Sequence, residues 1–114
     1  MKQASVSYTK GFNVLTGDEH SQAATMVIEP GGCEGGSDNS HRGADQWLYV
    51  QSGEGEAKIN DHIYPIGEGS LVLIQRGDRH EIRNTGSTSM KTLNIYLPPA
   101  YTSDGDELPR GKSD

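Results

Sequence analysis

The chain has 114 residues, a formal net charge of -6 and one cysteine, Cys33. This length suits a single core, so we expect one domain over residues 1–114. Nucleic-acid binding is disfavoured, because phosphate contacts need concentrated positive charge and the sequence has no cluster of Lys and Arg. One cysteine excludes an internal disulfide and a zinc site built from several cysteines. Any metal must therefore be held by His, carboxylate or amide groups.

A membrane location is not indicated either. No apolar run approaches the roughly 20 residues that a membrane-spanning helix needs. The first ten residues, MKQASVSYTK, lack the apolar centre of a secretion signal. We expect a cytoplasmic protein with no membrane partner.

Short strands separated by turn signals follow one another along the chain. Residues 24–29 (ATMVIE) predict a strand that ends at the Pro30-Gly31-Gly32 turn. Residues 34–43 (EGGSDNSHRG) have no hydrophobic periodicity and are predicted to form a loop. Further strand-forming segments lie at residues 46–53, 54–66, 70–75, 79–84 and 89–97.

The segment 54–66 is predicted to be a hairpin, with Asn60 and Asp61 as its two-residue turn. Strands at intervals of roughly 8 to 12 residues, without a convincing amphipathic helix, are typical of an all-β sandwich or barrel. The tail, residues 102–114, is polar and rich in turn formers, which predicts a segment that is mobile or held by a partner.

The strand at residues 46–53 (QWLYVQSG) has two largely apolar faces. Gln46, Leu48 and Val50 share one face, and Trp47 and Tyr49 lie on the other. A strand that is apolar on both sides suggests one sheet packed against another and, on the outer side, a second subunit. We therefore expect a homodimer formed through the face of Trp47 and Tyr49.

The segment 69–84, GSLVLIQRGDRHEIRN, has polar residues at a distinctive spacing. It resembles the second motif of the cupin family: a glycine, five residues, Pro-x-Gly, two residues, His, three residues, Asn. Gly77, His80 and Asn84 match that pattern in register, and Gln75 stands in the place of proline.

The segment 39–53, NSHRGADQWLYVQSG, resembles the first cupin motif, in which His-x-His is followed by a glutamate and then a glycine. With Gly53 as its end, Gln46 takes the place of the glutamate, His41 that of the second histidine and Asn39 that of the first. The resemblance covers residues 20–98 and implies the cupin double-stranded β-helix, a jelly-roll-like all-β barrel in a single domain.

The resemblance also implies a divalent metal, Fe, Mn, Ni or Zn, in the mouth of the barrel. Its ligands would be His41 and His80, with Gln46 and Asn39 assisting. Neutral imidazole is a good ligand for such metals and amide oxygen a poor one. Without a carboxylate the metal keeps its +2 charge, which favours an anionic chelating ligand. Asp45 is not expected to supply the missing charge, because its side chain alternates away from Gln46.

A small-molecule pocket is expected on the inward face, lined by Leu48, Val50 and Tyr96. The Tyr96 hydroxyl at the barrel mouth could act as an acid or serve as a hydrogen-bonding group. No residue is singled out as catalytic.

Three functions remain open from the sequence. The first is a metal-dependent enzyme of dioxygenase, lyase or isomerase type that acts on a small oxygenated substrate. The second is a non-catalytic or vestigial module that binds a small ligand without metal. The third is a metal-free enzyme that resembles the sugar epimerases of the same superfamily, with a histidine as base and a tyrosine as acid.

Other polar residues are expected to have structural or solvated roles. His20 and His62 lie in predicted turns, and Arg83 alternates outward. Cys33, in a glycine-rich loop, has no neighbour in sequence that would activate its thiol. Asn84 is expected to satisfy backbone groups at the end of a strand.

Overall fold

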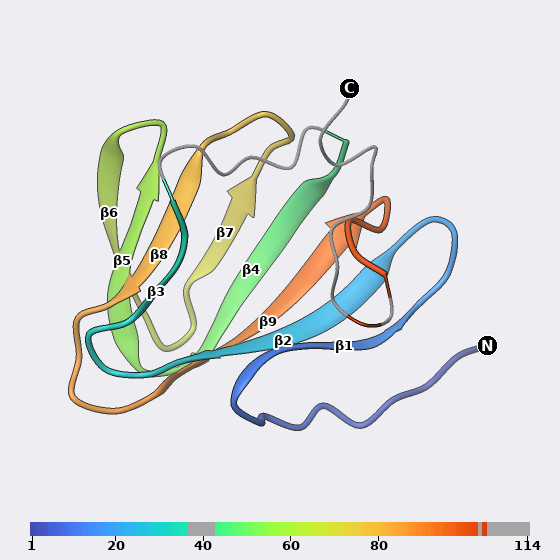
Figure 1. Ribbon diagram of the computed structural model, residues 1–114, viewed down its shortest axis with the longest axis horizontal. Helices are drawn as coiled ribbons and strands as arrows, with labels where there is room; N and C mark the ends of the chain where they lie inside the picture. Colours follow the sequence, from blue (N-terminus) through green and yellow to red (C-terminus); the bar gives the residue numbers. More distant parts are fainter. Residues whose placement is uncertain (37–42, 103, 105–114) are drawn as a thin grey trace.

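The computed structural model describes residues 1–36, 43–102 and 104. Asn39, His41 and nearly all of the tail at 102–114 lie outside the described residues. Within them the fold is all-β, and no helix is present that could span a membrane. The strands are β1 (Gly11–Gly17), β2 (Gln22–Ile28), β3 (Cys33–Gly36), β4 (Asp45–Ser52), β5 (Glu54–Ile59), β6 (His62–Gly67), β7 (Leu71–Ile74), β8 (His80–Asn84) and β9 (Met90–Leu97) (Figure 1).

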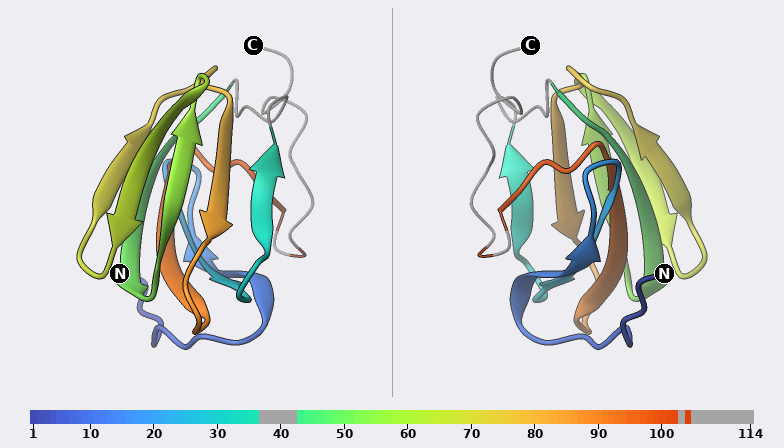
Figure 2. Two further views of the ribbon diagram at one scale, coloured as in Figure 1. Left: turned by 90° about the vertical axis from the view of Figure 1, so that its left-hand side faces the viewer. Right: turned by 90° about the vertical axis from the view of Figure 1, so that its right-hand side faces the viewer.

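The strands form two antiparallel sheets. The five-stranded sheet has the order β1-β2-β9-β4-β7, and the four-stranded sheet has the order β3-β8-β5-β6. Both sheets curve around a common interior (Figure 2). The main core fills this interior with residues from both sheets, among them Ile28, Leu48, Ala57, Ile66 and Ile82. Among the described residues no strand pairing joins the two sheets, so the arrangement is a sandwich with open edges.

Burial along β4 follows the predicted alternation. Gln46, Leu48 and Val50 are buried, whereas Trp47 and Tyr49 are exposed on the outer side. The inward face is thus confirmed. The outer face is not buried within this chain, because no element of the described fold fully covers it.

The hairpin predicted at residues 54–66 is confirmed as β5 and β6. Asn60 and Asp61 have φ angles of 48° and 71°, the left-handed values that a type I′ turn requires at both central positions. His62 was expected in this turn, but it is the first residue of β6 and pairs with Ile59. Its side chain is exposed, as expected.

Two strands were not expected from the sequence. β3 lies in the segment predicted to be a loop, where its backbone pairs with β8 from Cys33 opposite Arg83 to Gly36 opposite His80. Backbone pairing needs no side-chain alternation, so a glycine-rich strand leaves no periodic signal. β1 is half-buried at all seven positions, which likewise hides its period.

Asn84, at the end of β8, links the end of β2 to the β8–β9 loop. Its Nδ2 donates to the carbonyl oxygens of Ile28 and Thr88, both at 2.8 Å, and its Oδ1 accepts from the Gly86 N–H at 2.8 Å. The structural role expected for Asn84 is therefore confirmed.

One end of the sandwich, which we call the mouth, holds Gln46 of the five-stranded sheet and His80 of the four-stranded sheet. Gln46 near the start of β4 pairs with Tyr96 near the end of β9, and His80 starts β8 opposite Gly36 at the end of β3. The chain from Ile74 at the end of β7 reaches His80 through one short loop. The five-stranded and four-stranded sheets therefore bring Gln46 and His80 to the same end (Figure 1).

Close packing of β5 against β8 predicts a strong effect of adding one methyl group. A Cβ at Gly55 would overlap the carbonyl oxygen of Arg83 and Cε of Met90. We expect Gly55→Ala to lower the free energy of unfolding by about 3 kcal/mol, the upper part of the range for overpacking. Urea unfolding measures this. Gly67→Ala in the same hairpin is the control, because the nearest atom to its Cβ, Gly53 O, would lie 3.8 Å away. Equal stability of the two variants would contradict the packing.

Candidate functional site

His80 provides a neutral imidazole at the mouth. It is the first residue of β8, and only 5% of its surface is exposed. Burial lowers the pKa of His80, because removal from water disfavours the charged ring. A hydrogen bond with the backbone of Asp78 and the charge of that carboxylate act in the opposite direction and are outweighed. At neutral pH the ring is therefore uncharged and retains a lone pair.

Gln46 faces the same interior from the opposite sheet. Its side chain is 2% exposed, and its Nε2 donates to Asn94 Oδ1 at 2.9 Å. Its Oε1 is also buried, and no group among the described residues donates a hydrogen bond to it. A buried oxygen without a donor is unusual in folded proteins and calls for a partner.

Asn94 and Thr92 extend this contact along β9. Asn94 Nδ2 donates to Thr92 Oγ1 at 3.1 Å, and Thr92 Oγ1 donates to the carbonyl oxygen of Met26 at 3.1 Å. Both side chains are buried. They were not among the site residues expected from the sequence, although a signal was available: Thr92, Asn94 and Tyr96 recur with period two in a strand that faces the core.

Tyr96 lies in an aromatic cluster beside the mouth. Its ring meets that of Tyr101 at 5.1 Å and that of Phe12 at 6.4 Å between centroids. Burial raises the pKa of Tyr96 well above its ordinary value, and a side-chain hydrogen bond with Tyr101 acts in the same direction. Gln22 holds the cluster in place, since its Nε2 donates to Tyr101 O at 2.7 Å and its Oε1 accepts from Tyr101 N at 3.1 Å.

Hydrogen bonds between loops fix the rim of the mouth. Asp45 accepts from the backbone N–H of Arg76 at 2.8 Å, which also lowers the pKa of its carboxyl group. As expected, this carboxylate does not share the inward face of Gln46. Asn60 Nδ2 donates to Asp78 Oδ1 at 2.9 Å and so ties the β5–β6 turn to the β7–β8 loop.

The structure places the other expected site residues as follows. Leu48 and Val50 are fully buried in the main core, deeper than Gln46 along β4. The part of the chain that the structure describes contains no group of three or more His, Cys, Asp and Glu residues that could hold a metal ion. Of the four ligands expected from the sequence, the structure describes two, His80 and Gln46.

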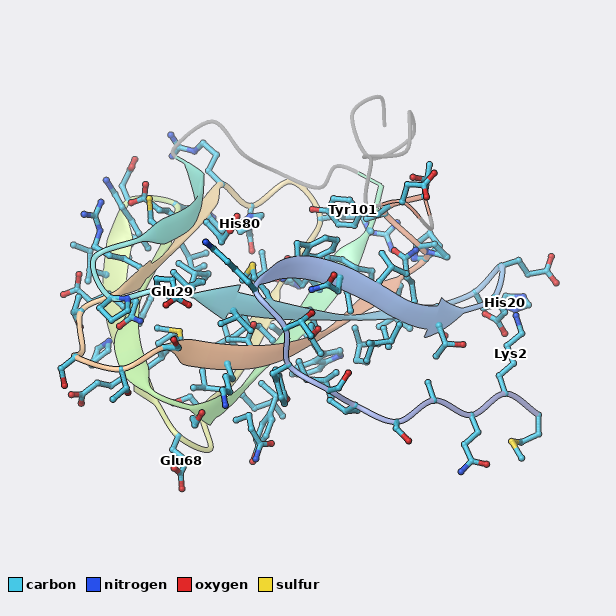
Figure 3. The ribbon with its side chains drawn as sticks, turned by 60° about the horizontal axis from the view of Figure 1, so that its bottom comes forward. Lys2, His20, Glu29, Glu68, His80 and Tyr101 are labelled. Atoms are coloured by element: carbon cyan, nitrogen blue, oxygen red, sulfur yellow. The ribbon has the colours of Figure 1, made fainter. Side chains whose placement is uncertain are left out.

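The polar residues that were expected to have structural or solvated roles lie away from this interior. His20 is exposed in the β1–β2 turn, apart from His80 (Figure 3). Arg83 is exposed and forms an ion pair with Glu81 at 3.2 Å. Cys33 is a free, exposed cysteine in β3.

The sequence profile of the cupin domain matches residues 24–96. This match covers more than half of the chain, which therefore belongs to the cupin family.

Among curated proteins, the chain is 31% identical to an oxalate-binding protein of Thermotoga maritima, over 65% of this chain and 60% of that protein. Two other curated relatives match over 36% and 51% of their lengths, so the chain corresponds to only part of the relatives that it matches.

Solved structures share the fold. A protein of Bacillus halodurans is 26% identical, with a TM-score of 0.73 over 87% of this chain and 76% of that chain. A predicted oxalate decarboxylase of Thermotoga maritima is also 26% identical, with a TM-score of 0.69 over 77% of this chain and 79% of that chain.

The raised pKa of Tyr96 predicts a late step in an alkaline titration. An unfolded tyrosine ionises near pH 10, so Tyr96 contributes stability that is complete below this pH and is lost as the pH rises above it. Absorbance titration of the five tyrosines should show one that ionises only as the protein unfolds. This late step should disappear in Tyr96→Phe and persist in Tyr64→Phe, which removes an exposed ring. Ionisation of every tyrosine in the folded protein would contradict the assignment.

Proposed function

We propose that the mouth binds a small anionic chelating ligand through a divalent metal ion held by His80 and Gln46, with His41 and Asn39 completing the ligand set. The observation that carries this proposal is the buried Oε1 of Gln46, which has no donor among the described residues and lies at the same end as the neutral ring of His80. Such an oxygen can act as a ligand of a metal ion.

The chemistry of these donors fits Fe, Mn, Ni or Zn. Imidazole nitrogen suits first-row divalent metals, and amide oxygen is an acceptable, weaker ligand. Because burial keeps His80 neutral, binding of a metal need not displace a proton from this ring at neutral pH. The set lacks a carboxylate, so we expect weaker binding than in a site that contains one.

Charge points to the class of ligand. Neutral donors leave the full +2 charge of a divalent ion in a buried mouth, where it attracts anions strongly. A small dicarboxylate presents two oxygens that can chelate one metal ion. The similarity to an oxalate-binding protein and to a predicted oxalate decarboxylase supports a ligand of this class.

If the site is catalytic, the metal supplies Lewis-acid and template chemistry for a reaction of dioxygenase, lyase or isomerase type. The residues of this chain would orient the ligand and exclude water: the rim bonds of Asp45 and Asn60 hold the loops, and the ring of Tyr96 closes one side.

A metal-free binding module is the second candidate. It is favoured because the expected ligand set has no carboxylate and because the described residues contain no group of three or more His, Cys, Asp and Glu that could hold a metal ion. A metal-free epimerase is less well supported. Its acid would be Tyr96, whose raised pKa makes it a weaker proton donor and whose hydroxyl is engaged with Tyr101.

Elemental analysis of protein purified without an affinity tag or chelator tests the metal. The wild-type protein should retain a transition metal close to one equivalent, and His41→Ala/His80→Ala should lose it while remaining folded, because both imidazole ligands are gone. His20→Ala is the control and should retain the metal, since His20 lies apart from the mouth (Figure 3). Unchanged metal content in the double variant would refute the ligand assignment.

A second arm removes the amide oxygen. Gln46→Leu should bind the same metal more weakly than the wild-type protein, because the buried oxygen ligand is lost. If neither protein retains or takes up Fe, Mn, Ni or Zn, the metal-free module becomes the better explanation.

We also propose that two copies associate through the outer face of β4 and β7. Trp47 and Tyr49 are each 38% exposed there, beside Leu73 and Leu71 on the neighbouring strand. Neighbouring exposed apolar residues of this kind mark association sites, and a two-fold axis would bury the same patch on both copies.

Sedimentation at micromolar concentration tests this association. The wild-type chain should be a dimer, and Trp47→Lys should be a monomer because a charge replaces the central ring of the patch. Ile63→Lys, which places the same charge at an exposed position of the four-stranded sheet, should remain a dimer. A monomeric wild-type chain would exclude the interface.

A further inference from the structure

Three hydrogen bonds form a continuous chain inside the five-stranded sheet. They run from Gln46 to Asn94, from Asn94 to Thr92 and from Thr92 to the backbone of Met26, with donor–acceptor distances of 2.9, 3.1 and 3.1 Å. Gln46, Asn94 and Thr92 are at most 2% exposed. Water therefore does not compete for these groups.

The backbone end of this chain fixes its direction. A carbonyl oxygen can only accept, so the single hydroxyl hydrogen of Thr92 is committed to Met26. Thr92 Oγ1 can then only accept from Asn94, which must present its NH₂ group to Thr92 and its oxygen to Gln46. Asn94 Oδ1 in turn requires the NH₂ group of Gln46.

The direction of the chain decides which atom Gln46 offers to the mouth. With Nε2 committed to Asn94, the remaining atom of the amide is Oε1, the buried oxygen that has no donor among the described residues. Rotating the amide would place two oxygens against each other at Asn94 and leave a buried NH₂ group unpaired. Both changes are unfavourable in a buried site.

We propose that Asn94 is a positioning residue that, held by Thr92, locks the Gln46 amide so that only an acceptor faces the ligand position. This inference rests on the proposed function, because the acceptor acts there as a metal ligand. It also defines selectivity: at this point the mouth accepts a cation or a hydrogen-bond donor. A carboxylate would meet a like-signed oxygen, so an anionic ligand contacts this side of the mouth only through the metal ion.

Asn94 suits this position because its amide carries an acceptor and a donor on separate atoms. The position must accept from Gln46 and donate to Thr92 at once. An ionised aspartate only accepts, and leucine does neither. The structure thus explains why a buried polar side chain stands in the middle of β9, where an apolar residue would otherwise pack well.

Metal titration of the full-length chain tests this role. Calorimetry with Mn²⁺ and with Zn²⁺ alone should show that Asn94→Leu and Thr92→Val bind roughly 10- to 100-fold more weakly than the wild-type protein, the usual effect of losing a residue that orients a ligand. Thr92→Ser should retain wild-type affinity because it keeps the hydroxyl.

Thr25→Val is the matched control. Thr25 is equally buried on the neighbouring strand, and its Oγ1 has no hydrogen-bond partner among the described residues. The Thr25→Val variant should therefore bind metal like the wild-type protein. Combining Asn94→Leu with Gln46→Ala should weaken binding no further than Gln46→Ala alone, because Asn94 acts through Gln46.

A second measurement needs no metal. In nuclear magnetic resonance spectra of the metal-free wild-type protein, the side-chain NH₂ hydrogens of Gln46 should exchange slowly with water, because one of them is bonded to Asn94. In Thr92→Val and Asn94→Leu the exchange should be faster, and in Thr92→Ser it should be unchanged. Exchange as slow in Asn94→Leu as in the wild-type protein would show that Asn94 does not hold the Gln46 amide and would overturn the positioning role.

The outcomes separate this inference from the proposed function. If the wild-type protein binds neither Mn²⁺ nor Zn²⁺, the proposed metal function fails, and the exchange measurement alone decides whether Asn94 holds the Gln46 amide. If the wild-type protein binds metal and Gln46→Ala weakens binding, while Asn94→Leu and Thr92→Val bind like the wild-type protein, the positioning role is refuted and the metal function stands.

Discussion

The register between β4 and β9 is the constraint on which the interior depends. It sets Gln46 opposite Tyr96 and Leu48 opposite Asn94. Side chains alternate between the faces of a strand, so a slip of β4 by one residue would turn Trp47 inward and expose the row of Gln46, Leu48 and Val50. The observed register gives the interior a gradient, from the apolar core around Val50 to polar groups at the mouth.

Burying polar groups at the mouth is costly unless they satisfy one another. The hydrogen bonds of Asn94 and Thr92 meet this requirement and end on a backbone carbonyl. Within this row of hydrogen bonds, the one group without a partner among the described residues is Oε1 of Gln46, at the end nearest the mouth. Buried polar groups that break the rule of local satisfaction are most often found at functional sites. The position of this exception at the mouth, and not the number of buried polar residues, therefore supports the proposed site.

Much of the fold could be predicted because its signals are local. The alternation of β4, the Asn60-Asp61 turn and the spacing of His80 and Asn84 are each visible within one short segment. β3 could not be predicted, since its pairing with β8 depends on backbone groups and its glycines carry no pattern. The role of Asn94 was out of reach for a different reason: its partner Gln46 is 48 residues away in sequence, and the contact exists only once β4 and β9 are paired.

Replacing a carboxylate by an amide at position 46 changes the proposed site in two opposing ways. Loss of the negative charge weakens the hold on a metal ion. However, the amide donates to Asn94, which donates to Thr92, and such hydrogen-bond chains polarise one another, so Oε1 carries more negative charge than an isolated amide oxygen. A metal held by neutral donors also keeps more charge for a bound anion. Since metal and anion each strengthen the binding of the other, and such coupling is reciprocal, the proposed site should hold its metal most firmly when the anionic ligand is present.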